Sequence, residues 1–196
     1  MGVMLPAELR LGELALRRPD PDQADGVVEA VNESLGHLGP WMAWAQQPAE
    51  LEATAMRLAL AGAAFELAGD ASWTIFDCAS DQVIGSCGLH QRMRPGGRDI
   101  GYWVRSGWTG RGVASRAAAA LTWVGFETLE LESVEIRCDE ANERSAAVAR
   151  RLGFEHLATV ESFCGAPRDS GRTMVWAMGR AAWSSVAPAG TSPLRR

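Results

Sequence analysis

Two glycines, Gly110 and Gly112, stand between a stretch with strand periodicity and a stretch with helical periodicity. Apolar residues alternate with other types over 99–105, and from Val113 onward they recur at helical spacing. Glycine in such a turn lets the backbone approach a ligand closely. The first turn of the following helix presents free N–H groups and the positive end of the helix dipole. Because phosphate groups bind at such helix N-termini, the spacing predicts a cradle for a pyrophosphate.

The predicted cradle also carries positive charge. Arg111 and Arg116 flank the turn, and a guanidinium can bind a phosphate through two hydrogen bonds. A tight strand-to-helix turn with two solvated arginines would explain the same residues, but the strand before it and the helix after it favour binding. The residues expected to form the cradle are Thr109, Gly110, Arg111, Gly112, Val113, Ala114, Ser115 and Arg116.

The elements after the cradle bring two further polar residues to attention. Apolar and polar residues alternate over 134–139, which predicts a strand, and a helix is expected at 145–152, ending at Gly153. Asn142 has the type and position of an N-cap, and Ser145 falls in the first helical turn. Capping alone would explain both residues, so any chemical role depends on what surrounds them.

The first half of the chain predicts a strand or a hairpin over 9–18, followed by helices over 22–38 and 51–65. Trp41 and Trp44 lie beside the break between these helices. They fit either a small hydrophobic cluster under a loop or an aromatic wall of a binding pocket. Strands are expected at 73–76 and 83–89, and two more follow at 154–163 and 172–178.

Length and composition describe an ordinary globular protein. The 196 residues predict one domain over 1–183, and the Ser-, Ala-, Pro- and Gly-rich segment 184–196 is expected to be a disordered tail. A net charge of −5 argues against a nucleic-acid partner, which needs a basic surface. No apolar run is long enough for a membrane span, and the N-terminus lacks a signal-peptide pattern, so we expect a cytoplasmic protein.

Cysteine and histidine spacing predicts neither disulfides nor a metal site. The four cysteines show no CxxC pair, and we interpret them as reduced residues. The three histidines have no ligand-like spacing and are interpreted as surface or structural residues. They are His37, His90 and His156.

Together these motifs resemble the acetyl-CoA-binding core of the GNAT family of N-acetyltransferases, and more narrowly its RimJ/RimL type. The matching residues run from Ile100 to Trp103, from Gly110 to Ala114, through Asn142 and Ser145, and from Leu152 to Phe154. The likeness extends from about Leu9 to Met178 and is more specific for the family than for a substrate. It implies an α/β (α+β) fold with a mixed, mostly antiparallel seven-stranded sheet, about four flanking helices and splayed central parallel strands.

The resemblance also implies how acetyl-CoA is held. The pantetheine arm is expected between the strands 101–105 and 134–139, with the backbone N–H of Val104 polarising the thioester carbonyl. Asn142 is expected to bond the pantetheine, and Ser145 to protonate the leaving thiolate. The RimL type often has Gln or Arg where Thr109 stands here, and Thr109 can still donate one hydrogen bond.

The base and the acceptor site are less fully specified by the resemblance. The glutamate that serves the RimL type aligns with Cys164 here, so we consider Glu161, three residues earlier, and Asp99 as candidate bases. Each could equally be a solvated or strand-end carboxylate. The resemblance places Trp41, Trp44 and Tyr102 at the acceptor site.

The sequence therefore predicts an acetyl-CoA-dependent N-acetyltransferase that transfers acetyl directly to a protein or peptide N-terminal α-amine, as a possible homodimer. Two alternatives stay open: an acetyltransferase for a small-molecule amine, such as an antibiotic or metabolite, and a non-catalytic acyl-CoA-binding sensor. Fold likeness is a weak argument for the choice among acceptors.

Overall fold

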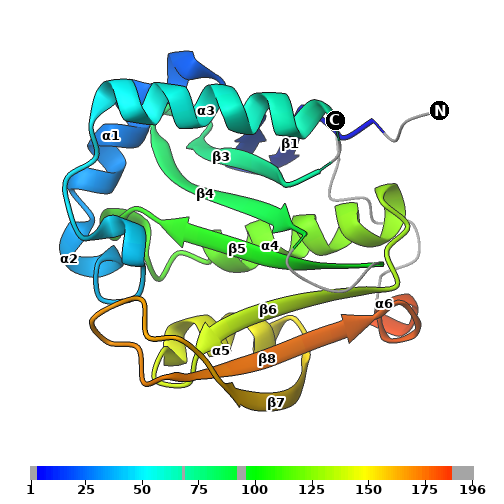
Figure 1. Cartoon of the computed structure of the whole chain (residues 1–196). Helices are drawn as coiled ribbons and strands as arrows, with labels where there is room; N and C mark the ends of the chain where they lie inside the picture. The colour runs from blue at the N-terminus through cyan, green and yellow to red at the C-terminus, as the bar shows by residue number, and fades with distance from the viewer. Residues whose placement is uncertain (1–3, 68, 92–95, 187–196) are drawn as a thin grey trace.

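A computed structural model describes residues 4–67, 69–91 and 96–186 of the chain. Its strands form one eight-stranded sheet in the order β1-β2-β3-β4-β5-β6-β8-β7 (Figure 1). The strands are β1 (Glu8–Leu11), β2 (Leu14–Arg17), β3 (Ala71–Asp77), β4 (Val83–His90), β5 (Gly97–Val104), β6 (Ser133–Asp139), β7 (Glu155–Glu161) and β8 (Arg172–Gly179). The α-helices are α1 (Ala24–Asn32), α2 (Leu35–Leu38), α3 (Leu51–Glu66), α4 (Val113–Trp123), α5 (Glu143–Arg151) and α6 (Arg180–Val186).

Within the described residues, β5 and β6 form the one parallel pair, and the other neighbouring strands of the sheet pair antiparallel. Their pairing covers four residue pairs and ends at Ile100 and Ile136. Beyond that point β5 still pairs with β4 as far as Val104, and β6 still pairs with β8 as far as Asp139. The two central strands therefore splay apart, as Figure 1 shows.

The two faces of the sheet differ in character. On β5, Ile100 and Val104 belong to the main hydrophobic core, to which Val113, Ala117 and Leu121 of α4 also contribute. In Figure 1 α4 and α5 lie behind the sheet, and α3 lies in front of its upper part. The front face carries a second, smaller hydrophobic cluster against α1, and where it lines a cavity it carries mostly polar and small side chains that leave room for a ligand. The front-facing cavity residues of β3, β4 and β5 are Ser72, Thr74, Ser86, Gly88, His90, Asp99, Gly101 and Trp103.

The expected fold class and the splayed parallel strands are confirmed, while two element counts were too low. The first strand is a hairpin, closed by Gly12 at a φ of 65°, which gives eight strands rather than seven. The helix expected over 22–38 is broken at Ser34, whose hydroxyl accepts a hydrogen bond from the Ser106 N–H at 2.9 Å. That hydrogen bond joins the break between α1 and α2 to the loop between β5 and α4.

Helix α6 also lies where no helix was expected, and residues 184–186 of the predicted tail belong to it. Trp183 anchors it, stacking on Phe126 at 5.5 Å and donating its indole N–H to Glu127 at 2.8 Å. Residues 187–196 lie outside the described part of the chain. Within the described ranges no helix is long and apolar enough to cross a bilayer, and no group of three potential metal ligands is found.

Candidate active site

The gap between β5 and β6 exposes two strand edges that have no strand partner. Arg105 donates its backbone N–H to Ile84 of β4 at 2.8 Å. Because successive residues of a strand direct their N–H groups to opposite sides, the Val104 N–H points toward the gap. An extended ligand with amide groups, such as a pantetheine arm, could pair with this edge as an additional strand would.

Residues from both faces of the sheet line one cavity of about 790 Å³ at this gap. Asp99 and Trp103 reach it from the front face, and Tyr102 and Ser145 reach it from the α5 side. The cavity therefore runs through the split in the sheet. Such a passage can bring a ligand held on one side into contact with a second ligand on the other.

Ser145 lies at the N-terminal turn of α5, inside the cavity. Asn142 caps this helix, since its side-chain oxygen accepts the Ser145 N–H at 3.2 Å. The Ser145 hydroxyl lies 2.9 Å from the Tyr102 hydroxyl and also contacts the Cys138 thiol. Burial raises the pKa of Tyr102 to about 12 and raises the pKa of Cys138 above its usual value. Three neutral proton-bearing groups thus meet beside the gap.

The glycine turn has the geometry expected of a phosphate cradle. Gly110 and Gly112 take φ angles of 75° and 76°, and Gly112 is the N-cap of α4. A Cβ at either glycine would meet nothing within 4 Å, so space is open above the turn. The free N–H groups of the first turn and the exposed Arg111 fit a pyrophosphate.

The side chains around the turn are partly engaged with the protein. Thr109 donates its hydroxyl to the Ser106 carbonyl at 3.0 Å, and Arg111 stacks on Trp108 at 4.7 Å. Ser115 accepts a hydrogen bond from Arg151 at 2.9 Å, which ties α4 to α5. No residue of the 109–116 turn lines the cavity, so the turn lies outside it, at the head of α4. The direct role of each turn residue remains a prediction.

A buried arginine paired with two half-exposed glutamates holds the end of β5 against α1 just before the turn. Arg105 is 4% exposed and donates from Nη2 to Glu29 and from Nε to Glu33, each at 2.7 Å. The guanidinium also bonds the Val83 carbonyl. These contacts position the end of β5, and with it the Val104 N–H.

Of the two candidate bases from the sequence, only Asp99 lies at the cavity. Its side chain is buried at 5% exposure. Glu161 lies on the edge strand β7, exposed to solvent and outside the cavity, and it acts electrostatically on Arg172 instead. The sequence reasoning missed His90, interpreted there as a surface or structural residue. The structure places it in the cavity, opposite Asp99 in the β4–β5 register.

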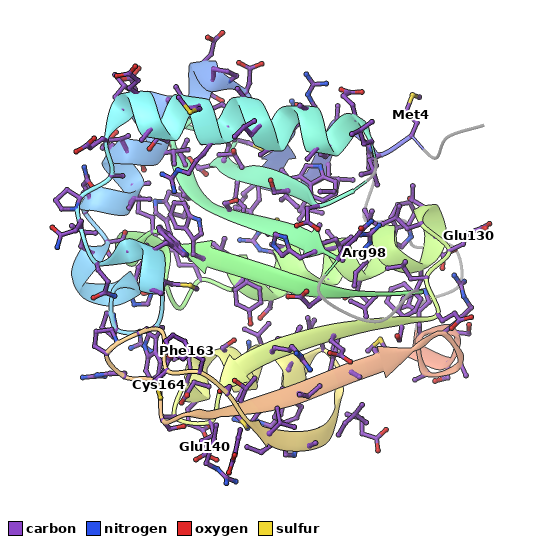
Figure 2. The ribbon with its side chains drawn as sticks, viewed as in Figure 1. Met4, Arg98, Glu130, Glu140, Phe163 and Cys164 are labelled. Carbon is purple, nitrogen blue, oxygen red and sulfur yellow. The ribbon has the colours of Figure 1, made fainter. Side chains whose placement is uncertain are left out.

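Two loops form the outer wall of the cavity on its front side. Trp41 and Trp44 both line it, and Trp44 meets Trp103 edge-on at 6.1 Å. Opposite them, Phe163 belongs to the loop between β7 and β8, which Figure 2 shows reaching up beside the α2 region. The Arg168 N–H donates to the Pro40 carbonyl at 3.0 Å, so the two loops touch.

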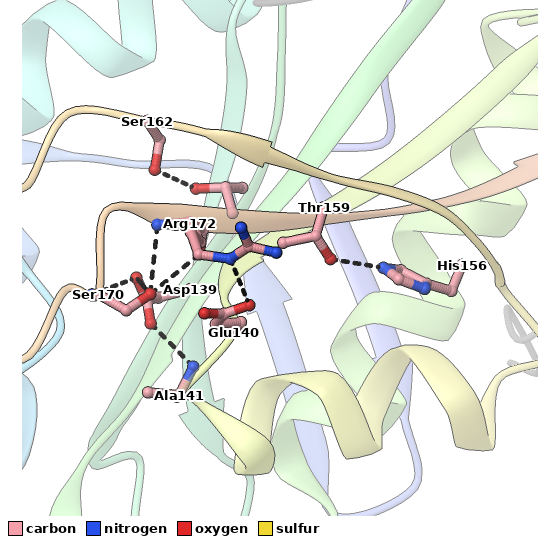
Figure 3. A network of polar contacts seen from close by, with 9 residues as sticks. Asp139, Glu140, Ala141, His156, Thr159, Ser162, Ser170 and Arg172 are labelled. Atoms are coloured by element: carbon pink, nitrogen blue, oxygen red, sulfur yellow. Dashed lines mark hydrogen bonds and ion pairs between the residues drawn. The ribbon is translucent and has the colours of Figure 1, made fainter.

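The β7–β8 loop is fixed to the end of β6 by the network in Figure 3. Asp139 accepts hydrogen bonds from the backbone N–H groups of Ala141 and Ser170, at 2.8 and 2.7 Å. Arg172 binds Glu140 at 2.9 Å. The wall that this loop provides is therefore a fixed part of the cavity.

Comparisons with known proteins agree with this geometry. A family model described as an acetyltransferase (GNAT) domain matches residues 13–155. The curated Bacillus subtilis (strain 168) protein YdaF, whose name assigns it to ribosomal N-acetylation, is 27% identical over 143 residues. This alignment spans 72% of the present chain and 77% of YdaF.

Solved structures show the same fold. RimL, the ribosomal L7/L12 alpha-N-protein acetyltransferase solved with coenzyme A, matches with a TM-score of 0.80 at 20% identity, covering 89% of this chain and 99% of RimL. MccE, the microcin C7 self immunity acetyltransferase solved with acetyl-CoA and AMP, matches with a TM-score of 0.79 at 16% identity, covering 90% and 98%.

Proposed function

The chain belongs to the acetyltransferase (GNAT) domain family and is an enzyme that uses acetyl-CoA, and we propose that its acceptor is the N-terminal α-amine of a protein or peptide. The observation that carries this proposal is the cavity that passes through the sheet between the splayed strands. It offers one side to an acyl donor and the other to an amine.

The front side of the cavity suits a peptide. Its floor carries the hydroxyls of Ser72, Thr74 and Ser86. Ser86 already donates to the Trp73 carbonyl at 3.0 Å, so its remaining lone pairs can accept a backbone N–H group. Thr74 is 2% exposed and donates to Gln23 at 2.6 Å. A volume of about 790 Å³ exceeds what the end of an acyl arm needs and leaves room for the first residues of a peptide. The printed names of YdaF and RimL point to the same class of acceptor.

Acetyl-CoA supplies a thioester carbonyl that a neutral amine can attack. In the proposed reaction the Val104 N–H stabilises the developing negative charge on the carbonyl oxygen. The Ser145 hydroxyl donates a proton to the departing thiolate. Asn142 holds the first turn of α5, and thus Ser145, in place.

A small-molecule amine is the second candidate acceptor. Three tryptophans, Trp41, Trp44 and Trp103, line the front side of the cavity and could stack on a planar ligand. MccE, whose printed name assigns it to self immunity, has the same fold. This alternative predicts activity without any requirement for a peptide backbone.

The test is release of free coenzyme A thiol from acetyl-CoA with paired acceptors. One arm uses short peptides with a free N-terminus, and its matched control uses the same peptides blocked at the N-terminus but carrying a lysine. A second arm uses small amines, including aminoglycosides. We expect turnover only with free N-termini. Turnover with small amines alone would overturn the peptide proposal, and turnover with the blocked lysine peptides would move the acceptor to a side-chain amine.

A further inference from the structure

We propose that His90, with the Asp70 carboxylate beside its ring, is the base that removes the proton from the acceptor amine. This inference rests on the proposed acyl transfer and adds the residue that the sequence did not reveal. His90 ends β4, lines the cavity and lies on the front face, the side assigned to the acceptor.

Two glycines, Gly88 and Gly101, make room for the His90 imidazole beside the point where β5 and β6 separate. A Cβ on Gly88 would lie 3.0 Å from the His90 Nε2, and a Cβ on Gly101 would lie 3.1 Å from the same atom. The ring therefore lies flat across β4 and β5. Gly101 is the first residue of β5 beyond the last β5–β6 pair. Nε2 is thus held at the opening through which donor and acceptor would meet.

Asp70 stands on the other side of the ring. Its Oδ1 accepts the backbone N–H of Gln91 at 2.7 Å, which fixes the carboxylate beside the end of β4. Its Oδ2 lies 3.8 Å from the His90 Nδ1, close enough for an ion pair when the ring is protonated. At 3.8 Å the carboxylate is beyond hydrogen-bond distance of Nδ1, so its effect on the ring is electrostatic: it stabilises the imidazolium once formed.

Other charges share this environment. Asp99 of β5 lies opposite His90 in register, and Arg57 of α3 lines the same cavity. Arg98, at the start of β5, interacts electrostatically with Asp70. Two carboxylates thus lie near the ring, and both favour its protonated form.

The proton balance is complete with these groups. The amine nitrogen forms a bond to the acetyl carbon, and its surplus proton passes to the His90 Nε2. The carbon–sulfur bond then breaks, and the thiolate takes the Ser145 proton on the far side of the split. Imidazolium later releases its proton to water, from which Ser145 is reprotonated. No further reactant is needed.

The test compares His90→Gln, Asp70→Asn and Asp99→Asn with the exposed control His156→Gln. With whichever amine the wild type accepts, we expect His90→Gln to lower kcat by about 10²-fold. In the plot of kcat against pH, the fall in kcat on the acidic side (the acidic limb) should vanish in this variant. Its affinity for acetyl-CoA should stay within twofold of the wild-type value. Asp70→Asn should keep the limb and shift it to lower pH, because the imidazolium loses a stabilising charge. Asp99→Asn should keep the limb, and His156→Gln should match the wild type.

A peptide with an aminooxy N-terminus supplies a second readout. Its weakly basic amine is uncharged at neutral pH, and once bonded to the acetyl carbon its nitrogen can lose the surplus proton to water without a protein base. His90→Gln should approach the wild-type rate with this acceptor, which a merely structural defect would not allow. His90→Asn serves as a smaller replacement if the glutamine variant misfolds. A retained limb in His90→Gln, or a limb lost only in Asp99→Asn, would overturn the assignment. If the wild-type enzyme turns over small amines but no peptide, the proposed peptide acceptor is wrong. The His90 variants can still be compared with a small amine as the acceptor.

Discussion

At the scale of single residues, the cavity separates two kinds of polar group. Ser145 and Tyr102 lie partly buried on the α5 side, with their hydroxyls 2.9 Å apart, where a leaving thiolate needs a proton. His90 and Asp70 lie on the front side, with a carboxylate fixed by a backbone amide. The proposed acid and the proposed base thus lie on opposite sides of one split, so each faces a different reactant: Ser145 the thiolate and His90 the amine.

Replacing Ser145 by Ala should lower kcat by about 10²-fold or more, because the proton donor to the thiolate is lost. The Kd for acetyl-CoA should change little, since the glycine turn and the strand edge are untouched. Steady-state kinetics and calorimetric binding separate these effects, with Ser184→Ala on α6 as the matched control. An unchanged kcat would show that Ser145 is not the acid.

Tyr102 is the single tyrosine of the chain, so its ionisation can be followed directly by ultraviolet absorbance. Burial raises its pKa from 10.0 to about 12, and the native protein should show no tyrosinate at pH 10. Over this interval the folded state holds a proton that the unfolded state has lost, so stability should fall as pH rises from about 10 to about 12. The Tyr102→Phe variant supplies the blank, and tyrosinate appearing near pH 10 would contradict the buried placement.

At the scale of elements, the strand–turn–helix over β5 and α4 depends on a backbone that only glycine adopts easily. Gly112→Ala should destabilise the protein by about 1–2 kcal/mol, because φ is 76° while no atom crowds the new Cβ. The same distortion should weaken acetyl-CoA binding about tenfold, equivalent to about 1.4 kcal/mol.

Gly107→Ala is the matched control for that substitution. Gly107 lies in the same loop, has no positive φ, and also has open space at its Cβ. Denaturant unfolding and coenzyme A titration of both variants should separate backbone conformation from the mere addition of a methyl group. Equal effects would show that the left-handed backbone at Gly112 is unimportant.

The sequence predicts this element well because its signals are local: alternation, two glycines and then helical spacing. The local signal at Ser145 is the Asn142 cap alone, and its expected role as the acid came from the family resemblance. His90 could not be found this way, since its place depends on pairing with β5 and on Gly88 and Gly101, which lie apart in sequence. Gly101 belongs to the matched family motif, but no sequence signal near it indicates that it packs against His90. The ungapped register aligned Cys164 with the glutamate of the RimL type, and Glu161 was considered because it lies three residues earlier. Neither step could show that β7 is the edge strand.

At the scale of the whole molecule, one sheet carries both halves of the site, and only four residue pairs join β5 to β6. The main hydrophobic core nevertheless includes residues from β1 to β6 and from β8, so we predict a single domain over 1–183. Thermal unfolding should give one transition that coincides by tryptophan fluorescence and far-ultraviolet circular dichroism, with equal calorimetric and van't Hoff enthalpies. Two separated transitions would show that the halves fold independently.

The contact between Arg168 and Pro40 joins two loops that supply neither the glycine turn, nor the strand gap, nor the proposed acid and base. Substitutions there can alter which acceptor fits while the machinery of transfer stays intact. Over evolutionary time, an ancestral enzyme of this shape could be retargeted from one recipient to another by drift in these two loops alone. Among enzymes of this shape with different acceptors, we therefore expect the largest sequence differences in the two loops at residues 40–44 and 162–171.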